Sequence, residues 1–289
     1  MEKSFSPIPN RRPLLQGQQT GVYNERRFSG TDTMLLTIDV GNTTITIGLF
    51  DGDRLQATWR LASDHERLAD EYAVILLGLL QTEGLDAHAI NDGVLASVVP
   101  DLVPVFDGLC RKHLHVTPLV VDTGVRTGVR ILYDSPRDVG ADRVADVAAA
   151  MQLYGPPPFI IVDLGTGLVF DAVSADGDYL GGAIAPGIHV AAEALSARAA
   201  KLYPVELTRP ATAIGKNTVT AVQSGLVFGY VGLIEAMVAR FKAELGGRAK
   251  VIGTGGWAEF ISRETDIFDV VDPDLTLQGL RIIYNLNRE

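Results

Sequence analysis

Cysteine is nearly absent from this chain, with Cys110 as the single example among 289 residues. One cysteine excludes an intramolecular disulfide and any zinc site that needs several cysteines. Long apolar runs are missing as well. The longest nearly uncharged run, Gly225 to Ile234, ends at Glu235, and ten residues are too few to span a bilayer.

Positive charge is also scarce. The chain has 25 Lys and Arg against 35 Asp and Glu, a net charge of −10. Because a phosphate backbone is bound by a basic face, this balance argues against DNA or RNA as a partner. With no segment typical of a signal peptide or a membrane anchor, we expect a cytoplasmic, soluble protein without a membrane partner.

The remaining composition, 47% hydrophobic and 21% charged, is that of a globular protein. At about 150 residues per domain, the length predicts about two domains. Residues 1–33 differ from the rest: they are rich in Pro and Gln, carry a net charge of +2, and end just before Met34 and the first convincing strand. Two explanations stay open for this extension, a start placed too early or added upstream, and a native disordered arm.

The rest of the chain contains a diverged internal repeat. Residues 36–43 (LTIDVGNT) and 160–167 (IIVDLGTG) both form an apolar strand that ends in Asp-x-Gly. Each is followed by a second apolar run and an Asp-Gly-Asp turn, at 51–53 and 176–178. Because both features recur at nearly the same offset, about half the remaining length, we predict two duplicated domains.

Apolar periodicity predicts mixed α/β units. The expected strands are 35–39, 43–50, 54–60, 93–98, 118–121, 159–163, 168–174 and 250–253, and the expected helices are 70–80, 144–154, around 188–202, 218–245 and one that closes the chain. The run Gly155 to Pro158 is typical of a connection between domains. The stretch from Gly225 to Phe241 is apolar on two sides and is either core or a subunit interface.

The loop Asp39 to Thr43 has the composition of a phosphate site. Its glycine permits a tight turn, and backbone N–H groups with the Asn42 and Thr43 side chains can face a phosphate. Asp39 could hold a metal ion directly or through water. An ordinary hairpin turn with local hydrogen bonds explains either loop of the repeat equally well, but the repetition itself favours a phosphate cleft between two domains.

A second candidate is the sequence Gly140 to Arg143, just ahead of a helix. A carboxylate at Asp142 could accept the proton of a substrate hydroxyl during phosphoryl transfer, and the helix N-terminus should favour its ionised form. Arg143 could bind a carboxylate or a phosphate. The plainer alternative is that Asp142 caps the helix and Arg143 pairs with Asp146.

Two common nucleotide signatures fail. The Gly-Lys pair at 215–216 is followed by Asn217 where a P-loop requires Ser or Thr, and Pro210 stands at the first glycine position. The glycines at 165 and 167 are followed by Phe170 rather than Gly or Ala, so the Rossmann fingerprint fails too.

Taken together and in order, the motifs resemble those of type III pantothenate kinase, a member of the actin-like ATPase and sugar-kinase superfamily. The resemblance spans 34–289 and rests on Asp39–Thr43, Ala96–Pro100, Tyr133 with Pro136, Gly140–Arg143, Asp163–Thr166, Gly181-Gly182, Pro186-Gly187, Gly215–Thr218 and Gly253–Gly256.

The resemblance implies an α/β fold of two duplicated ribonuclease H-like domains, 34–155 and 156–289, with mixed sheets around a nucleotide cleft. It implies ATP-dependent phosphorylation of pantothenate to 4′-phosphopantothenate, the first step towards coenzyme A, with Mg²⁺ accompanying ATP. A monovalent cation, K⁺ or NH₄⁺, and a homodimer with the pantothenate pocket at or near the subunit interface are further implications.

The resemblance also assigns roles to individual residues. Asp142 would be the base on the substrate hydroxyl, and Asp163 the ligand of the monovalent cation. The residues expected to bind ATP are Asp39, Val40, Gly41, Asn42, Thr43, Thr44, Ile45, Thr46 and Thr166. Those expected to line the pantothenate site are Tyr133, Gly140, Ala141, Asp142, Arg143 and Thr218.

One stretch departs from the family pattern. After Thr166 the family usually has Ala-Thr-Thr, whereas this chain has Gly167-Leu168-Val169. The loss of two hydroxyls beside the expected cation and substrate sites favours one alternative function, a non-catalytic regulatory or accessory homologue. Retention of Asp39, Asp142 and Thr218 favours the enzyme.

Overall fold

Strand β1, Met34–Val40, lies inside the first of two sheets and is buried along almost its whole length. The computed structural model describes residues 34–198 and 204–288, all of them in one compact unit, Thr33–Glu289. The two explanations for residues 1–33 therefore concern residues outside the described part.

Each sheet combines antiparallel and parallel strands. The first has the order β3-β2-β1-β4-β5, with β2 Thr44–Asp51, β3 Arg54–Ala62, β4 Ile90–Ser97 and β5 Leu119–Val120. The second has the order β11-β10-β7-β8-β9-β6, with β6 Arg130–Ile131, β7 Phe159–Leu164, β8 Gly167–Val173, β9 Asp178–Pro186, β10 Lys250–Thr254 and β11 Val270–Val271.

The two sheets repeat one topology. In each, three consecutive strands form an antiparallel meander, and two later strands add in parallel on the side of the first strand. Read from its third strand, each sheet has the order 3-2-1-4-5, which is the ribonuclease H-like arrangement, and β6 extends the second sheet. The predicted fold class and internal repeat are confirmed.

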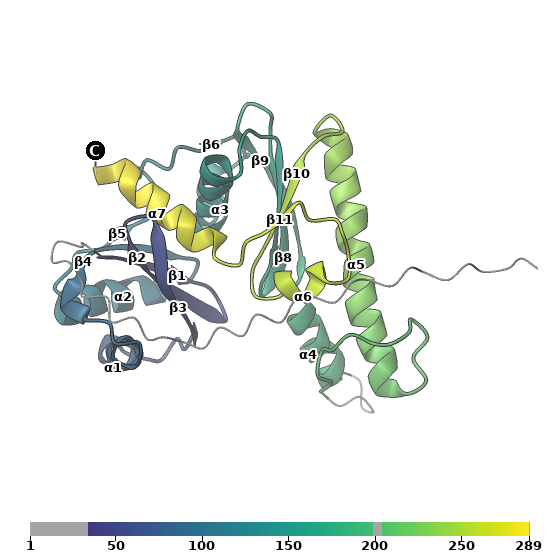
Figure 1. Ribbon diagram of the computed structural model, residues 1–289, viewed down its shortest axis with the longest axis horizontal. Helices are drawn as coiled ribbons and strands as arrows, with labels where there is room; N and C mark the ends of the chain where they lie inside the picture. Colours follow the sequence, from purple (N-terminus) through teal and green to yellow (C-terminus); the bar gives the residue numbers. More distant parts are fainter. Residues whose placement is uncertain (1–33, 199–203, 289) are drawn as a thin grey trace, which may run out of the picture. The chain divides into compact units, whose positions relative to one another are not determined.

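Seven helices of the described part cover the sheets (Figure 1). They are α1 Ala69–Thr82, α2 Val103–Leu109, α3 Ala141–Leu153, α4 Ile188–Arg198, α5 Thr218–Glu244, α6 Ala258–Ser262 and α7 Leu275–Arg288. α1 and α2 share an apolar core with one face of the first sheet, and α5 and α6 share another with one face of the second. α3 and α7 pack between the two sheets, because side chains of both belong to the cores on their inner faces.

Two segments cross the predicted boundary between 155 and 156. Strand β6 pairs with β9 of the second sheet, and helix α7 packs against β1 and β4 of the first. Each half of the chain therefore supplies a piece of the other half's sheet or core. The division into 34–155 and 156–289 stays a prediction.

Helices α3 and α7 approach each other closely. A Cβ at Gly279 would lie 1.9 Å from the carbonyl oxygen of Ala145, so only glycine permits this crossing. At the same contact Thr276 donates a hydrogen bond to the buried Asp146 at 2.7 Å. The crossing holds the first turn of α3, which carries Asp142 and Arg143, between the sheets.

Helix α5 is long enough and apolar enough, by length and composition, to span a bilayer, with a mean hydropathy of 1.5 over its most apolar window. Only 28% of that window is buried. The helix is far longer than the ten-residue run visible in the sequence because isolated polar residues interrupt the run without ending the helix. Of the two predicted alternatives, core or interface, this exposure fits an interface better.

Candidate active site

The loop after β1 is a tight turn between antiparallel strands. The N–H of Gly41 donates to the carbonyl of Thr44 at 3.0 Å, and a Cβ at Gly41 would lie 2.8 Å from that oxygen. The Ser63 hydroxyl donates to the Gly41 carbonyl at 2.6 Å. These bonds hold the turn in place and leave the Asn42 and Thr43 side chains exposed at its tip.

Not all of the predicted ATP-binding residues present side chains at this loop. Val40 and Ile45 are fully buried in the first core. Only their backbone groups could reach a nucleotide. Thr44 is exposed and Thr46 half-buried, as alternation along β2 requires.

The loop after β7 faces the loop after β1. The hydroxyls of Thr43 and Thr166 lie 2.6 Å apart, although 123 residues separate them in the chain. Gly187 donates to the Thr166 carbonyl at 2.9 Å and must be glycine, since a Cβ there would lie 2.3 Å from the Gly165 carbonyl. The two halves of the sequence repeat therefore converge on one place.

Asp142 lies in the first turn of α3. Its Oδ1 accepts the backbone N–H of Arg143 at 2.8 Å, and a Cβ at Gly140 would lie 2.3 Å from the same oxygen. Glycine at 140 therefore leaves room for this carboxylate. Ala141 is half-buried beside it. The predicted ion pair of Arg143 with Asp146 is absent from the described residues, because Arg143 pairs with Asp171 instead.

Three carboxylates from three elements approach each other here. Burial, reinforced by the charges of Asp142 and Asp163, raises the pKa of Asp39 well above its usual range. Burial, with Asp142 and Asp171, raises the pKa of Asp163 to about 7. Among the described residues, no positive charge acts against these shifts at Asp39 or Asp163, so a bound cation would favour the ionised form of both.

The pKa of Asp142 is raised as well, mainly by burial. The backbone N–H groups of the helix start and the charge of Arg143 act in the opposite direction. The helix N-terminus does favour the ionised form, as predicted, but desolvation outweighs it.

The surroundings of Asp163 fit a bound cation in part. A Cβ at Gly255 would lie 2.3 Å from its Oδ1 and one at Gly165 3.4 Å, so two glycines keep space open around the carboxylate. In residues 34–198 and 204–288, no three His, Cys, Asp or Glu side chains lie close enough to hold a metal ion by themselves. A cation here would need phosphate, water or backbone oxygens as further ligands.

Arg143 is anchored by two residues that the sequence analysis missed. Its Nε and Nη2 donate to Asp171 Oδ1 at 2.9 and 2.6 Å, and the Tyr179 hydroxyl donates to the same oxygen at 2.9 Å. Tyr133, 39% exposed, lies over Gly181 with its ring centroid 6.2 Å from that of Tyr179. A buried Asp in the middle of an apolar strand was the available signal for Asp171, whereas β9, which carries Tyr179, was not predicted at all.

Leu168 and Val169, which replace two hydroxyl-bearing residues of the family pattern, lie on opposite faces of β8. Leu168 is buried in the core on the α5 side. Val169 points to the opposite face and pairs in register with Asp163. Only one of the two replaced hydroxyl positions therefore faces the carboxylates.

Thr218 is the first residue of α5 and is exposed. Within the described part of the chain it forms no hydrogen bond with Tyr133 or with the residues at 140–143. Ring contacts link Tyr133 to Tyr179 and Tyr179 to Arg143, which follows Gly140, Ala141 and Asp142 in the chain. Thr218 shares none of these contacts.

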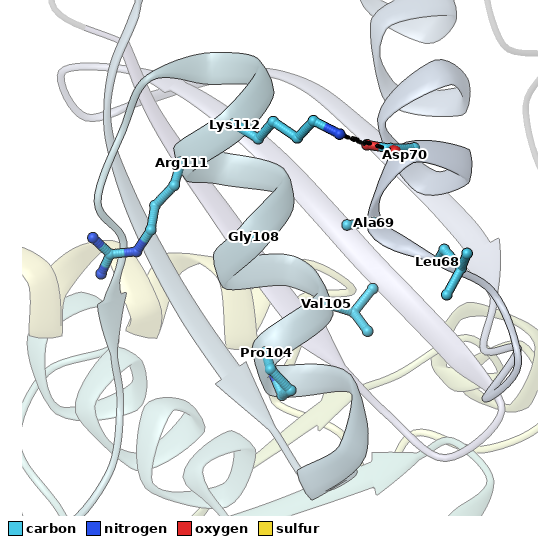
Figure 2. A pocket seen from close by; sticks show the side chains of 8 residues that line it. All are labelled: Leu68, Ala69, Asp70, Pro104, Val105, Gly108, Arg111 and Lys112. Atoms are coloured by element: carbon cyan, nitrogen blue, oxygen red, sulfur yellow. Dashed lines mark hydrogen bonds and ion pairs between the residues drawn. The ribbon is translucent and has the colours of Figure 1, made fainter.

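A separate pocket of about 630 Å³ lies between the start of α1 and α2 (Figure 2). Its cations are already paired, Lys112 with Asp70 at 2.7 Å and Arg111 with Asp107 at 2.8 Å. None of the predicted site residues lines it. The chemistry-bearing residues lie instead between the two loops and the start of α3.

Comparison with known proteins decides the family. The model of the type III pantothenate kinase family matches residues 35–240. The type III pantothenate kinase of Moorella thermoacetica is 52% identical over 254 residues, which cover 88% of this chain and all of that protein. The type III pantothenate kinase of Dehalococcoides mccartyi strain CBDB1 is 50% identical over 254 residues, which cover 88% of this chain and 96% of that protein. The chain belongs to the type III pantothenate kinase family.

Membership in this family makes the chain a kinase, an enzyme that transfers phosphate to an alcohol group. Solved structures agree on the fold alone. A Campylobacter jejuni protein assigned to the Baf family of transcriptional activators superposes with a TM-score of 0.56 at 19% identity, covering 88% of this chain and 98% of its own. The ethanolamine utilization protein EutJ of Carboxydothermus hydrogenoformans gives 0.52 at 14% identity, covering 86% and 89%.

Proposed function

We propose that this protein catalyses ATP-dependent phosphorylation of pantothenate to 4′-phosphopantothenate, with Asp142 as the base. One observation carries the proposal: the Thr43–Thr166 contact joins the two phosphate-type loops beside the start of α3, which presents Asp142 and Arg143. Phosphoryl transfer depends mainly on positioning and charge neutralisation, and this arrangement supplies both.

The loop 39–46 and Thr166 bind the ATP phosphates. Exposed hydroxyls and backbone N–H groups at the tips of both loops offer hydrogen bonds to phosphate oxygens. Mg²⁺ bound with ATP would supply charge neutralisation on the phosphates. Asp39, at the end of β1, is the carboxylate best placed to hold Mg²⁺ directly or through water.

Asp163 is the ligand of a monovalent cation, K⁺ or NH₄⁺. The open space that Gly165 and Gly255 leave around it and the lack of a compensating cation among its neighbours support this role. A positive ion beside Asp163 would also lower the pKa of Asp142. This effect favours the ionised form of Asp142, which is the form that a base requires.

On the substrate side, Tyr133 and the backbone of Gly140 and Ala141 line the pantothenate site. Asp142 and Arg143 contact the substrate there. Asp142 accepts the proton of the pantothenate hydroxyl as the hydroxyl oxygen attacks the γ-phosphorus of ATP. The bond from this phosphorus to the β–γ bridging oxygen breaks, and ADP leaves. Arg143 uses the donors that Asp171 leaves free to bind a substrate oxygen.

We further propose a homodimer formed through α5. Five small residues, Ala221, Gly225, Gly229, Gly232 and Ala236, form one exposed stripe on this helix, and a Cβ at any of the three glycines would meet nothing within 4 Å. Thr218 begins the same stripe. A pantothenate pocket at or near the subunit interface would therefore let Thr218 of one protomer reach the pocket of the other.

The test is conversion of pantothenate by residues 34–289 with MgATP, with and without K⁺ or NH₄⁺. We expect turnover in the wild type and a loss of kcat of about 10²–10⁴-fold in Asp142→Asn, with ATP binding measured by calorimetry largely unchanged. Near-native turnover in the variant would refute the base assignment. A folded wild type that binds ATP but phosphorylates no pantothenate in any salt would favour the accessory homologue.

A further inference from the structure

Asp171, in the middle of β8, gathers three hydrogen bonds on a single buried oxygen. The residue is 1% exposed, and its Oδ1 accepts from Arg143 Nε, Arg143 Nη2 and the Tyr179 hydroxyl. The three residues come from α3, β8 and β9, so the network ties the helix that carries Asp142 to the sheet.

The sheet surface closes around the guanidinium of Arg143. The group lies 5.6 Å from the centroid of the Tyr179 ring. A Cβ at Gly182 would lie 3.2 Å from Nη2, besides clashing with the Phe170 carbonyl. With Nε and Nη2 engaged by Asp171, Nη1 keeps both of its N–H donors.

An unanchored arginine at this position would have a competing partner. Asp142 is its chain neighbour, and the charge of Arg143 already acts on that carboxylate. A flexible guanidinium that paired with Asp142 would occupy the lone pairs that a base needs. Asp171 therefore has two effects at once: it orients the free edge of Arg143 and keeps the cation engaged elsewhere.

We propose that Asp171 is a positioning residue that sets the affinity for pantothenate by holding Arg143, with Tyr179 as the third member of the network. The free Nη1 edge then binds an anionic or carbonyl oxygen of the substrate. This inference rests on the proposed function, because it concerns the substrate side of the same site. Asp171 itself touches no reacting atom.

The experiment compares steady-state kinetics of wild type and Asp171→Asn, an isosteric change that removes the charge. We expect KM for pantothenate to rise by about tenfold or more, since a charge-assisted hydrogen bond is weakened. We expect kcat to fall as well, because a released Arg143 can pair with Asp142, while KM for ATP stays constant. In an Arg143→Ala background, the same substitution should have no further effect, because Asp171 acts through Arg143.

The matched control is Asp178→Asn. Asp178, 7% exposed, also pairs with an arginine, Arg130, and lies next to Tyr179 in β9. It makes no contact with Arg143 within the described residues. We expect no change in KM for pantothenate, so a general effect of removing an Asp–Arg pair from this sheet would be visible here.

Two further measurements keep the test decisive. If Asp171→Asn unfolds, Tyr179→Phe removes only one O–H donor and should raise KM for pantothenate about two- to fivefold. NMR of the Arg143 Nε–H should show slow exchange with solvent in the wild type and fast exchange in Asp171→Asn.

The outcomes separate the two proposals. Two results would overturn the inference and leave the function standing, provided that the wild type turns over pantothenate. One is an unchanged KM in Asp171→Asn. The other is a double variant in which the effects of Asp171→Asn and Arg143→Ala on KM multiply. Absence of wild-type turnover overturns the function and the inference together, even where the Arg143 signal behaves as expected.

Discussion

At the scale of one residue, the burial of Asp163 lowers the stability of the folded protein. Its side chain is desolvated next to two other carboxylates, which raises its pKa to about 7. In the unfolded chain an aspartate titrates near 4. Between these values the folded protein holds a proton that the unfolded chain has released, so stability falls as the pH rises from about 4 to about 7 and stays low above that.

We therefore predict that Asp163→Asn stabilises the protein at pH 8 in buffer without K⁺, NH₄⁺ or Mg²⁺. The free energy of unfolding should rise by on the order of 1–3 kcal/mol relative to the wild type, with little difference at pH 4. Chemical denaturation at both pH values measures this. The exposed Asp101→Asn is the control and should change neither value.

The same pair of proteins tests the cation assignment. Added K⁺ should stabilise the wild type at pH 8 by binding only the folded state, and the effect should vanish in Asp163→Asn. An equal response to K⁺ in both proteins would move the cation site elsewhere.

At the scale of elements, α5 is unusual because its exposed face is built from small residues. Glycine inside a helix costs roughly 1 kcal/mol relative to alanine, and at Gly225, Gly229 and Gly232 no close contact within the described residues compensates for it. Small residues permit another backbone to approach closely, so their spacing supports the proposed contact between two α5 helices.

We predict that Gly229→Leu abolishes the proposed dimerisation while the chain stays folded, since the leucine side chain enters open space in the single chain. Sedimentation equilibrium measures the association, and circular dichroism the fold. Gly78→Leu in α1, where a side chain also meets nothing within 4 Å, is the matched control and should leave the dimer intact. A dimer that survives Gly229→Leu would contradict the α5 interface.

At the scale of the whole described unit, α3 and α7 join the two sheets. The last helix of the chain packs on the first sheet, and β6 from the first half extends the second sheet. Because each half lacks a piece that the other supplies, we expect the halves to unfold together rather than one at a time.

The two tryptophans of the chain make this measurable. Trp59 lies in β3 of the first sheet, and Trp257 follows β10 of the second. In Trp257→Phe the fluorescence reports on Trp59 alone, and in Trp59→Phe it reports on Trp257 alone. We predict that urea unfolding gives the same fluorescence midpoint in both variants, once each variant's overall stability has been corrected for by circular dichroism. Midpoints that still differ between Trp59 and Trp257 after this correction would show that the two halves unfold as independent domains.

Local patterns in the sequence were enough to predict the first two strands of each meander and the long helix α5. β1, β2, β7 and β8 were all predicted to within one or two residues at each end, because alternating burial and Asp-Gly turns are encoded by neighbours in the chain. β9 was missed, since its glycines and mixed polarity depend on packing against β8, and α3 begins three residues earlier than its apolar spacing indicates.

The sequence by itself determined the duplication, the family resemblance and the candidate residues, because motifs and their order are properties of the chain alone. Only the tertiary structure decided that Thr43 meets Thr166, that Arg143 pairs with Asp171 rather than Asp146, and that Val169 but not Leu168 faces Asp163. Desolvation and contacts between distant segments set these outcomes, and neither can be read from spacing along the chain.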